Sequence, residues 1–362
     1  MTRTFLTFHD YNDFDDEERL MATVNPIGLD IGSMSIRAVE ITRGKEGPVI
    51  TNVGMVPLPP GAVQGGVIND AKVVTAELKR LWSASKFRTR KVVLGVTNPQ
   101  VVVREMSVSN LPLRELRQAL PFQVRDALPL PVERSLLDFF PLENPGEKET
   151  VRGLLIAAPK DVVTTAVHAA EQAGLHVARV DLASFALMRA VSCLDAKVEA
   201  IVDIGASATS VIVHTDGVPL IVRTLPRGGA EITQAVSAQL GIDPRQAEAL
   251  KCDLGLRRDG GEDEAAEAIR AAVRPLVNEI RNSFAYLGSG DRPTRVSRVT
   301  LSGGGALMPG LVEDLNTQLG IEVTLSDPAV RARRGRRDRQ DNLDRFRTAA
   351  AVSVGLALGA AA

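Results

Sequence analysis

The chain has 362 residues, with 43 Lys and Arg against 44 Asp and Glu and a formal net charge of −1. This length predicts about two domains, and a hydrophobic content of 44% excludes a wholly disordered chain. The balanced charge supplies no basic field that would hold nucleic acid, and aromatic residues at 4% argue against a base-stacking surface.

Cysteine is too scarce, and histidine too scattered, for disulfide or metal chemistry. We expect Cys193 and Cys252 to be small buried hydrophobic residues in a reducing compartment. No two histidines have the spacing of zinc ligands, which argues against a zinc enzyme. The histidines are His9, His168, His176 and His214.

The amino-terminal segment, residues 1–24, is acidic and lacks the positive start and apolar run of a secretory signal. No stretch of about 20 consecutive apolar residues occurs, so we expect no membrane span. We treat this segment as an acidic leader whose order the sequence leaves open, and which either tethers a partner or has no role. Its carboxylates are Asp10, Asp13, Asp15, Asp16, Glu17 and Glu18.

After this leader the chain alternates strands and helices. Three β-rich runs separated by turn residues, at 27–31, 36–42 and 49–56, predict a hairpin meander. Helical spacing then runs to Ser85, with Asp70 as the expected N-cap. Further expected strands are 91–96, 101–108, 136–142, 151–158 and 175–180, and further expected helices are 113–127, 160–173 and 182–193.

The second half opens with another meander, in which Asp216 and Gly217 form a predicted hairpin turn. Residues 331–342 are charged and arginine-rich, and we expect a solvated loop there, with contact to an anionic partner or lipid as the alternative. The expected strands are 199–204, 209–214, 219–225, 299–301 and 321–325, and the expected helices are 230–240, 244–252, 262–287, 310–319 and 345–358.

A duplication is the strongest internal signal. The run Asp30-Ile31-Gly32 returns as Asp203-Ile204-Gly205, at an offset of 203 − 30 = 173 residues, or about half of the chain. Each copy ends an apolar strand and begins a tight turn. Two such halves predict two α/β lobes that face a common cleft.

The residues of the first copy suit phosphate. Gly32 lets the backbone approach a ligand, the turn amides and the Ser33 hydroxyl can donate to phosphate oxygens, and Arg37 lies on the return strand. Two carboxylates, Asp30 and Asp203, would hold Mg²⁺ mainly through its water molecules. The alternative is a pair of ordinary hairpin turns.

A glycine-rich turn, Ser302-Gly303-Gly304-Gly305, follows the predicted strand 299–301. Without side chains, these residues would let a flat ligand lie on the backbone. Neither a Rossmann fingerprint nor a Walker A sequence is present.

Together and in this order, the three elements resemble those of the actin/Hsp70/hexokinase superfamily. The resemblance implies that Asp30, Gly32, Ser33, Ser35 and Arg37 form a first phosphate loop, and that Asp203, Gly205 and Ala206 form a second. It implies an adenosine motif at Gly303, Gly304 and Gly305, and nucleoside contacts from Glu248 and Lys251, for which an exposed ion pair is the alternative.

Within this superfamily the chain resembles the PilM family of type IV pilus assembly proteins over roughly 26–359, and FtsA shares the layout. Leu111-Pro112, Leu137-Asp138-Phe139 and Arg227-Gly228-Gly229 are among the matching segments. The implied fold is a two-lobed actin-like α/β ATPase fold with a small FtsA-type inserted subdomain. The implied boundaries are leader 1–24, lobe one 25–196 with the insertion at about 101–180, lobe two 197–345 with a helical subdomain at about 226–294, and a closing helix 346–362.

The resemblance also implies a function: a cytoplasmic ATP- and Mg²⁺-binding scaffold, recruited to the inner face of the cell membrane. It would bind the cytoplasmic tail of a PilN-like protein and connect the platform to pilus motor ATPases. Asp181 is the candidate that orients water for slow or negligible hydrolysis, with a helix N-cap as its alternative. An FtsA-like division protein and a sugar-kinase-like phosphotransferase remain open alternatives. An extended tail would dock between lobe one and the inserted subdomain, where apolar side chains are available, but we expect most of these side chains to lie in the core and assign no groove residues. They are Leu111, Leu116, Leu120, Phe122, Val124 and Leu128.

Overall fold

The computed structural model describes residues 25–144, 146, 148–257, 264–285, 294–335 and 348–361. The acidic leader and most of the arginine-rich stretch lie outside the described residues. Contacts divide the chain into two units, and among the described residues the divisions fall within α4 (Ala183–Val191), between Arg331 and Ala332, and at the start of α10 (Ala351–Ala361). No helix in the described part of the chain is long and apolar enough to cross a membrane.

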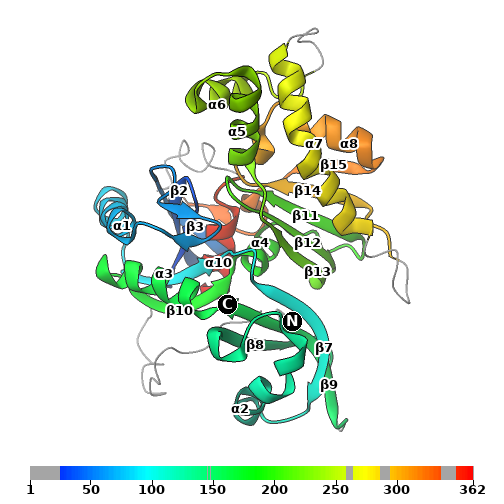
Figure 1. Ribbon diagram of the computed structural model, residues 1–362. Helices are drawn as coiled ribbons and strands as arrows, with labels where there is room; N and C mark the ends of the chain where they lie inside the picture. The colour runs from blue at the N-terminus through cyan, green and yellow to red at the C-terminus, as the bar shows by residue number, and fades with distance from the viewer. Residues whose placement is uncertain are drawn as a thin grey trace. The chain divides into compact units, whose positions relative to one another are not determined.

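A six-stranded sheet in the order β10-β6-β1-β2-β3-β16 forms the centre of the first unit (Figure 1). β1, β6 and β10 are parallel, because crossover connections join them, whereas β2 and β3 continue from β1 as the predicted antiparallel meander. The strands are β1 (Ile27–Ile31), β2 (Ser35–Gly44), β3 (Gly47–Pro57), β6 (Lys91–Val96), β10 (His176–Leu182) and β16 (Arg333–Arg334).

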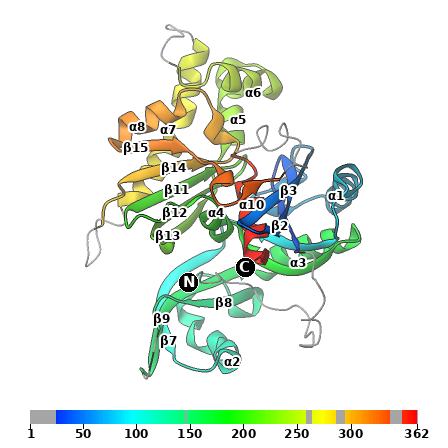
Figure 2. The same cartoon turned by 180° about the vertical axis from the view of Figure 1, so that it is seen from behind.

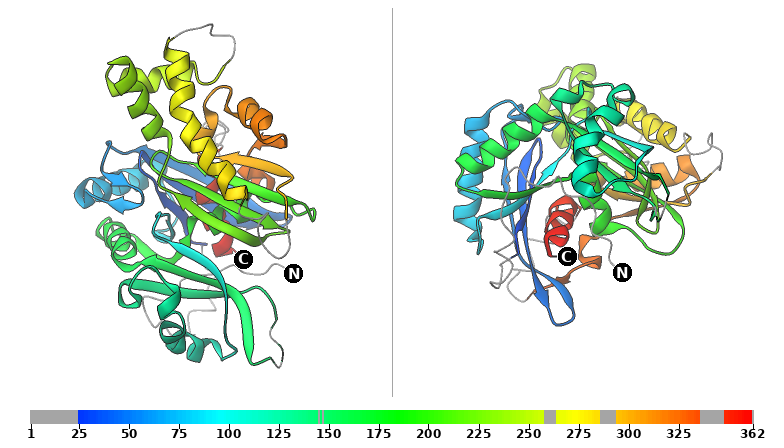
Figure 3. Two further views of the ribbon diagram at one scale, coloured as in Figure 1. Left: turned by 45° about the vertical axis from the view of Figure 1, so that its right-hand side comes forward. Right: turned by 90° about the horizontal axis from the view of Figure 1, so that it is seen from below.

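Alternation along β1 directs its side chains to two different faces. Ile27 and Leu29 are fully buried in a core shared with α1 (Ala71–Ser85) and α3 (Lys160–Gln172). Gly28 faces α10 instead, and a Cβ atom at this position would lie 2.0 Å from the backbone oxygen of Ser353. The absence of a side chain therefore lets α10 pack directly on the sheet, as the right panel of Figure 3 shows.

The prediction of a loop throughout 331–342 is wrong at its start. Arg333 pairs with Val49 and Arg334 with Ile50, which adds β16 to the sheet edge in parallel with β3. The amide of Gly335 also donates to the oxygen of Ile50 at 2.8 Å. A two-residue strand made through a long-range contact leaves no periodic signal in the sequence. Another short pair, β4 (Val63–Gln64) with β5 (Val67–Ile68), was likewise not predicted.

A separate three-stranded antiparallel sheet, in the order β7-β9-β8, occupies the middle of the first unit's sequence (Figure 2). Its strands are β7 (Val102–Ser109), β8 (Ser135–Pro141) and β9 (Thr150–Pro159), and α2 (Leu113–Gln123) packs on it. β8 and β9, which correspond to the strands predicted at 136–142 and 151–158, pair antiparallel. The predicted helix ends earlier, at Gln123, and a short 3₁₀ turn, Arg125–Ala127, follows.

The second unit contains a five-stranded sheet in the order β13-β12-β11-β14-β15. The predicted turn at Asp216 and Gly217 is confirmed, with both residues at positive φ. The strands are β11 (Val198–Ile204), β12 (Thr209–Thr215), β13 (Val218–Leu225), β14 (Arg298–Ser302) and β15 (Glu322–Leu325), and the helices are α5 (Gly229–Leu240), α6 (Pro244–Asp253), α7 (Glu264–Ala285) and α8 (Leu311–Leu319).

The prediction that both cysteines are buried is wrong, because Cys193 and Cys252 are exposed. Cys193 lies two positions after Val191, the last residue of α4. Cys252 is on α6, whose buried positions are Ala247 and Lys251. Each thiol lies at or near a helix end, and partial desolvation together with the nearby carboxylate of Glu199 or Glu248 raises the pKa of Cys193 and of Cys252.

Candidate functional site

The first predicted phosphate turn follows β1. Asp30 lies opposite Arg37 in the β1–β2 register, and Arg37 Nη1 is 3.2 Å from Asp30 Oδ2. Arg37 Nε also donates to the Ser35 hydroxyl at 3.0 Å, and the amide of Gly32 donates to the Ser35 carbonyl at 3.0 Å. Burial raises the pKa of Asp30, and the guanidinium of Arg37 offsets part of that rise. The turn therefore contains its own counterion.

A second carboxylate shares the face of the sheet on which Asp30 lies. Asp30 and Asp181 are both register partners of Gly95, one on each side of β6. Register partners in a parallel sheet point to the same face, so the two carboxylates flank a position without a side chain. Asp181 is buried and its Oδ1 accepts from the amide of Leu182 at 2.7 Å, just before α4. The carboxyl ends of parallel strands are where such sheets bind ligands.

Asp138, on β8, is a titratable group that was not predicted as a site residue, although it belongs to the family segment Leu137-Asp138-Phe139. Its Oδ1 accepts from the amide of Phe139 at 2.9 Å, whereas its Oδ2 is buried without a hydrogen-bond partner among the described residues. Burial raises the pKa of Asp138 to about 7, the charge of Asp181 adds to the rise, and Arg117 opposes it. Sequence alone carries no sign of this, because the partners are more than 20 positions away.

The second predicted phosphate turn follows β11 and closes as the first does. The amide of Gly205 donates to the carbonyl of Ala208 at 2.9 Å. The start of α5 then packs on the turn, with the Gly229 amide donating to the Gly205 carbonyl at 2.9 Å and the Ala230 amide to the Ala206 carbonyl at 2.8 Å. A Cβ atom at Gly228 would lie 2.5 Å from the Gly205 oxygen, so only glycine allows this approach.

The glycine-rich turn after β14 lies beside this second phosphate turn. Asp203 pairs with Ser302 in the parallel β11–β14 register. Gly303 has φ of +84°, and a Cβ atom there would lie 2.4 Å from the Ile204 oxygen and 3.0 Å from Asp203 Oδ1. At Gly304 a Cβ atom would meet nothing within 4 Å. Two motifs that are about a hundred residues apart thus form one glycine-lined surface with an open position at Gly304.

The predicted nucleoside pair, Glu248 and Lys251 on α6, is built into the same unit. Lys251 Nζ donates to Glu248 Oε2 at 2.7 Å, to the Thr233 hydroxyl at 2.8 Å and to the Gly229 carbonyl at 3.0 Å. The predicted i,i+3 ion pair is present, but only Glu248 is exposed, because Lys251 is buried at 7% exposure. Burial would raise the pKa of Glu248, but bonds from Lys251 and Thr233 lower it overall. Lys251 therefore fixes α6 to the first turn of α5.

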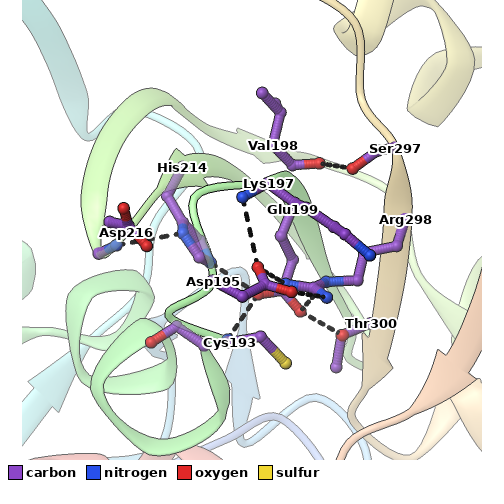
Figure 4. A network of polar contacts seen from close by, with 12 residues as sticks. Cys193, Asp195, Lys197, Val198, Glu199, His214, Asp216, Ser297, Arg298 and Thr300 are labelled. Carbon is purple, nitrogen blue, oxygen red and sulfur yellow. Dashed lines mark hydrogen bonds and ion pairs between the residues drawn. The ribbon is translucent and has the colours of Figure 1, made fainter.

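A buried polar network that the sequence did not reveal lies at the opposite end of β11 (Figure 4). Glu199 and His214 are both fully buried, with His214 Nε2 3.0 Å from Glu199 Oε2. The carboxylate also accepts from the Thr300 hydroxyl at 2.6 Å and from the Cys193 amide at 2.7 Å. Burial favours a raised pKa for Glu199, but these bonds together lower it. The network ties the turn after α4 to three strands.

The structure thus groups the predicted residues by unit. Asp30, Gly32, Ser35 and Arg37 lie in the turn between β1 and β2 or on the strands beside it, and Asp181 lies on the same sheet face as Asp30. Asp203, Gly205, Ala206, Gly303 and Gly305 meet at the carboxyl ends of β11 and β14, and Lys251 reaches them through Gly229. In the described part of the chain, no three His, Cys, Asp or Glu side chains gather closely enough to hold a metal ion alone.

Curated relatives of the chain are cell division proteins. FtsA of Bacillus subtilis is 23% identical over 350 residues, which cover 83% of this chain and 78% of the relative. FtsA of Streptococcus pneumoniae is 22% identical over 348 residues, covering 83% and 75%.

Solved structures confirm the predicted actin-like α/β fold. The PilM-PilN type IV pilus biogenesis complex contains a chain with 27% identity and a TM-score of 0.82, and the match covers 94% of this chain and 99% of that one. MreB5 of Spiroplasma citri bound to ADP is similar in fold, with 14% identity, a TM-score of 0.51 and coverage of 92% and 95%.

The family model described as Type IV pilus assembly protein PilM matches residues 28–361, which is nearly all of the described chain. The resemblance seen in the sequence is confirmed: the chain is a pilus-assembly member of the actin-like superfamily and belongs to the PilM family.

Proposed function

We propose that this chain is an ATP-binding, actin-like scaffold of type IV pilus assembly. The observation that carries the proposal is the glycine-lined surface at the ends of β11 and β14, where Gly303 and Gly305 pack on Ile204 and Gly304 stays open. A packed glycine turn beside a phosphate-type turn suits a nucleoside attached to phosphates. Solved relatives of this fold bind ADP or AMPPNP.

In this proposal the triphosphate is held by the turns after β1 and β11. Gly32, Ser33, Ser35 and Arg37 would serve the first turn, and Gly205 and Ala206 the second. Asp30 and Asp203 would hold Mg²⁺ through water, and the ion would neutralise phosphate charge. Gly303, Gly304 and Gly305 would support the adenosine, and Glu248 with Lys251 would border it.

Hydrolysis is proposed to be slow or negligible. Asp181 is the candidate for orienting water, but its Oδ1 is already bonded to the Leu182 amide. The second turn continues as Ala206-Ser207, without a further glycine or acidic residue. Rapid phosphate release that depends on Asp203 would contradict this part of the proposal.

Thermal unfolding with ATP and Mg²⁺ tests nucleotide binding. At 100 times its Kd a ligand adds about 2.7 kcal/mol to stability. Gly304→Val is the diagnostic variant, since its side chain enters open space: we expect the ligand-free melting temperature to stay and the ATP-dependent rise to disappear. No rise for the natural chain would refute the proposal, and a substrate-dependent ADP-release screen checks the sugar-kinase alternative.

We further propose that the partner is the cytoplasmic tail of a PilN-like membrane protein, which would place the chain at the inner face of the cell membrane, where it would connect to pilus motor ATPases. The support is the similarity to the PilM-PilN complex. The three-stranded sheet has two edge strands, β7 and β8, that can accept an extended peptide.

A titration with a fluorescent PilN-type tail peptide tests this partner. Near this sheet, Phe122 on α2 offers an apolar contact for such a peptide, because it is 77% exposed, whereas the neighbouring Leu120 and Val124 are buried in the core. We expect micromolar binding for the tail and none for a scrambled peptide of the same composition. Absence of binding at micromolar concentrations would leave the nucleotide proposal intact and refute this one.

A further inference from the structure

A compact basic segment joins α1 to β6. Residues 86–91 read Lys-Phe-Arg-Thr-Arg-Lys, with four cations and no carboxylate, and we call them the basic loop. Lys86, Arg88 and Arg90 are exposed. Arg88 already pairs with the buried Glu40, at 3.4 Å, so Lys86, Arg90 and Lys91 supply the charge that remains for a partner.

Neighbouring elements do little to neutralise the basic loop. Arg90 Nη1 donates to the Gly174 carbonyl at 3.3 Å, and the His176 amide donates to the Arg90 carbonyl at 2.8 Å. Both of these acceptors are backbone oxygens and carry no net charge. Glu171, three residues before Gly174, is the exposed carboxylate that α3 contributes on this side. The loop therefore keeps a local excess of positive charge.

The register of the sheet places the residues just before β1 beside the basic loop. Ile27 pairs with Val92 in parallel, and Lys91 pairs with His176. The residues just before Ile27 and those just before Val92 therefore lie at the same end of the sheet, about 5 Å apart across neighbouring strands. Asn25 also donates its Nδ2 to the Ile41 carbonyl at 3.3 Å, which holds the start of β1 in place.

The chain that leads into this point is strongly acidic. Residues 10–18 contain six carboxylates in nine positions. Glu18 is only 25 − 18 = 7 positions before Asn25. Fully extended, seven residues span at most about 25 Å. A tethered segment of this length has an effective concentration on the order of millimolar at its neighbour. Oppositely charged groups must approach within about 8 Å to attract each other at physiological salt, and this connection is short enough to allow that approach.

We propose that the basic loop is a docking surface for the acidic segment 10–18 of the same chain. Carboxylates of the segment pair with Lys86, Arg90 and Lys91. The docked segment thereby covers a cationic surface at the end of the sheet opposite the carboxyl ends where Asp30 and Asp181 lie. An anionic membrane is the competing occupant, and it lacks the covalent connection that favours the leader.

Zero-length carbodiimide coupling of the full chain tests the contact, because it joins a lysine amine to a carboxylate only when they touch. We expect mass spectrometry to find residues 10–18 coupled to Lys86 or Lys91 at least tenfold more often than to Lys72, an exposed lysine at the start of α1. The excess should vanish in 0.5 M NaCl or in a full chain with all six carboxylates changed to amides. Equal coupling to Lys72 would overturn the proposal.

A competition measurement separates the leader from other occupants. A labelled peptide of residues 8–19 should bind the amide-leader chain at least tenfold more tightly than the natural chain, whose own leader competes. The triple variant Lys86→Asn, Arg90→Gln, Lys91→Gln should lose that binding, and asparagine suits the positive φ of position 86.

The matched control variant is Lys72→Gln, Arg114→Gln, Lys160→Gln, which removes three exposed cations elsewhere in the unit and should keep the peptide affinity. Identical peptide affinity for the natural and amide-leader chains would overturn the proposal. So would an amide-leader chain that binds phosphatidylglycerol vesicles through the basic loop but does not bind the peptide, since this result assigns the loop to a membrane.

Discussion

The turns after β1 and β11 close with the same hydrogen bond, from Gly32 N to Ser35 O at 3.0 Å and from Gly205 N to Ala208 O at 2.9 Å. Their surroundings differ. Across the strand pair, Asp30 faces Arg37, whereas Asp203 faces Ser210. Across the strand pair, the first turn therefore has an ion pair, whereas the register partner of Asp203 is an uncharged serine.

The second turn is instead supported by backbone packing. Gly228 and Gly303 approach it so closely that a Cβ atom at either would lie 2.5 Å or less from a turn carbonyl. At Gly32 the nearest atom to a Cβ is Arg37 Nη2, the end of a flexible side chain, at 2.9 Å. The duplicated backbone is thus stabilised by charge in one unit and by close packing in the other, so the two copies should respond to different perturbations.

Added volume should affect the second turn most. Gly303→Ala would place a methyl group 2.4 Å from the Ile204 oxygen and would strain a φ of +84°. We expect a loss of about 3 kcal/mol in unfolding free energy, measured by urea denaturation. The matched control is Gly304→Ala, whose methyl group enters open space and should change stability by less than about 0.5 kcal/mol. Equal losses in the two variants would contradict the packing argument.

Removing a cation should affect the first turn. Arg37→Met leaves Asp30 buried without its counterion, and we expect a loss of about 2 kcal/mol at pH 8. The double variant Arg37→Met, Asp30→Asn should recover most of this lost unfolding free energy, and a double-mutant cycle measures the recovery.

The pH dependence of this loss has a defined sign. Without Arg37, the pKa of Asp30 rises further above its unfolded value, so the fold is favoured at low pH and destabilised as pH rises through the folded pKa. The Arg37→Met loss should therefore shrink toward pH 5. A loss that grows on acidification would show that burial does not control this carboxyl.

Local signals in the sequence were sufficient for much of the fold. β1 and β6 have the bounds that their apolar runs predict, and Asp70 caps α1 by accepting from the Val73 amide at 3.0 Å. The duplicated turns were visible because glycine and aspartate at a strand end are local requirements. The family model confirms the resemblance that these motifs carried.

Features made by distant partners could not be predicted in this way. Lys251 has the i,i+3 spacing of a surface pair, yet it is buried because the Gly229 carbonyl and Thr233 on another helix surround its amine. Glu199 joins Thr300 across about a hundred residues. Such contacts depend on which strands become neighbours, and a single sequence has no periodicity that reports this.

The Glu199 network adds a buried charge to the second unit. It lies at the start of β11, and the packed turn at Gly205 follows the end of the same strand. A lowered pKa means that the ionised carboxylate stabilises the fold above the unfolded pKa, and that this contribution is lost as pH falls through the folded pKa. Glu199→Gln should cost about 1–2 kcal/mol at pH 7 and less near pH 3. Glu171→Gln, at an exposed position on α3, is the control and should show neither effect.

The smallest expected effect tests whether charge also couples the groups around the first turn. Asp138 should titrate near pH 7, because burial is the main cause of its raised pKa and Asp181 adds to it. Asp181→Asn removes that second contribution, so the pKa of Asp138 should fall by a few tenths of a unit, a change that carbon-detected NMR of the carboxyl resolves. Lowering the pKa of Asp138 should also raise stability slightly at pH 8, where its charge is buried at a cost, and leave it unchanged at pH 5. An unchanged titration of Asp138 in Asp181→Asn would mean that the two carboxylates do not interact, and that burial alone raises this pKa.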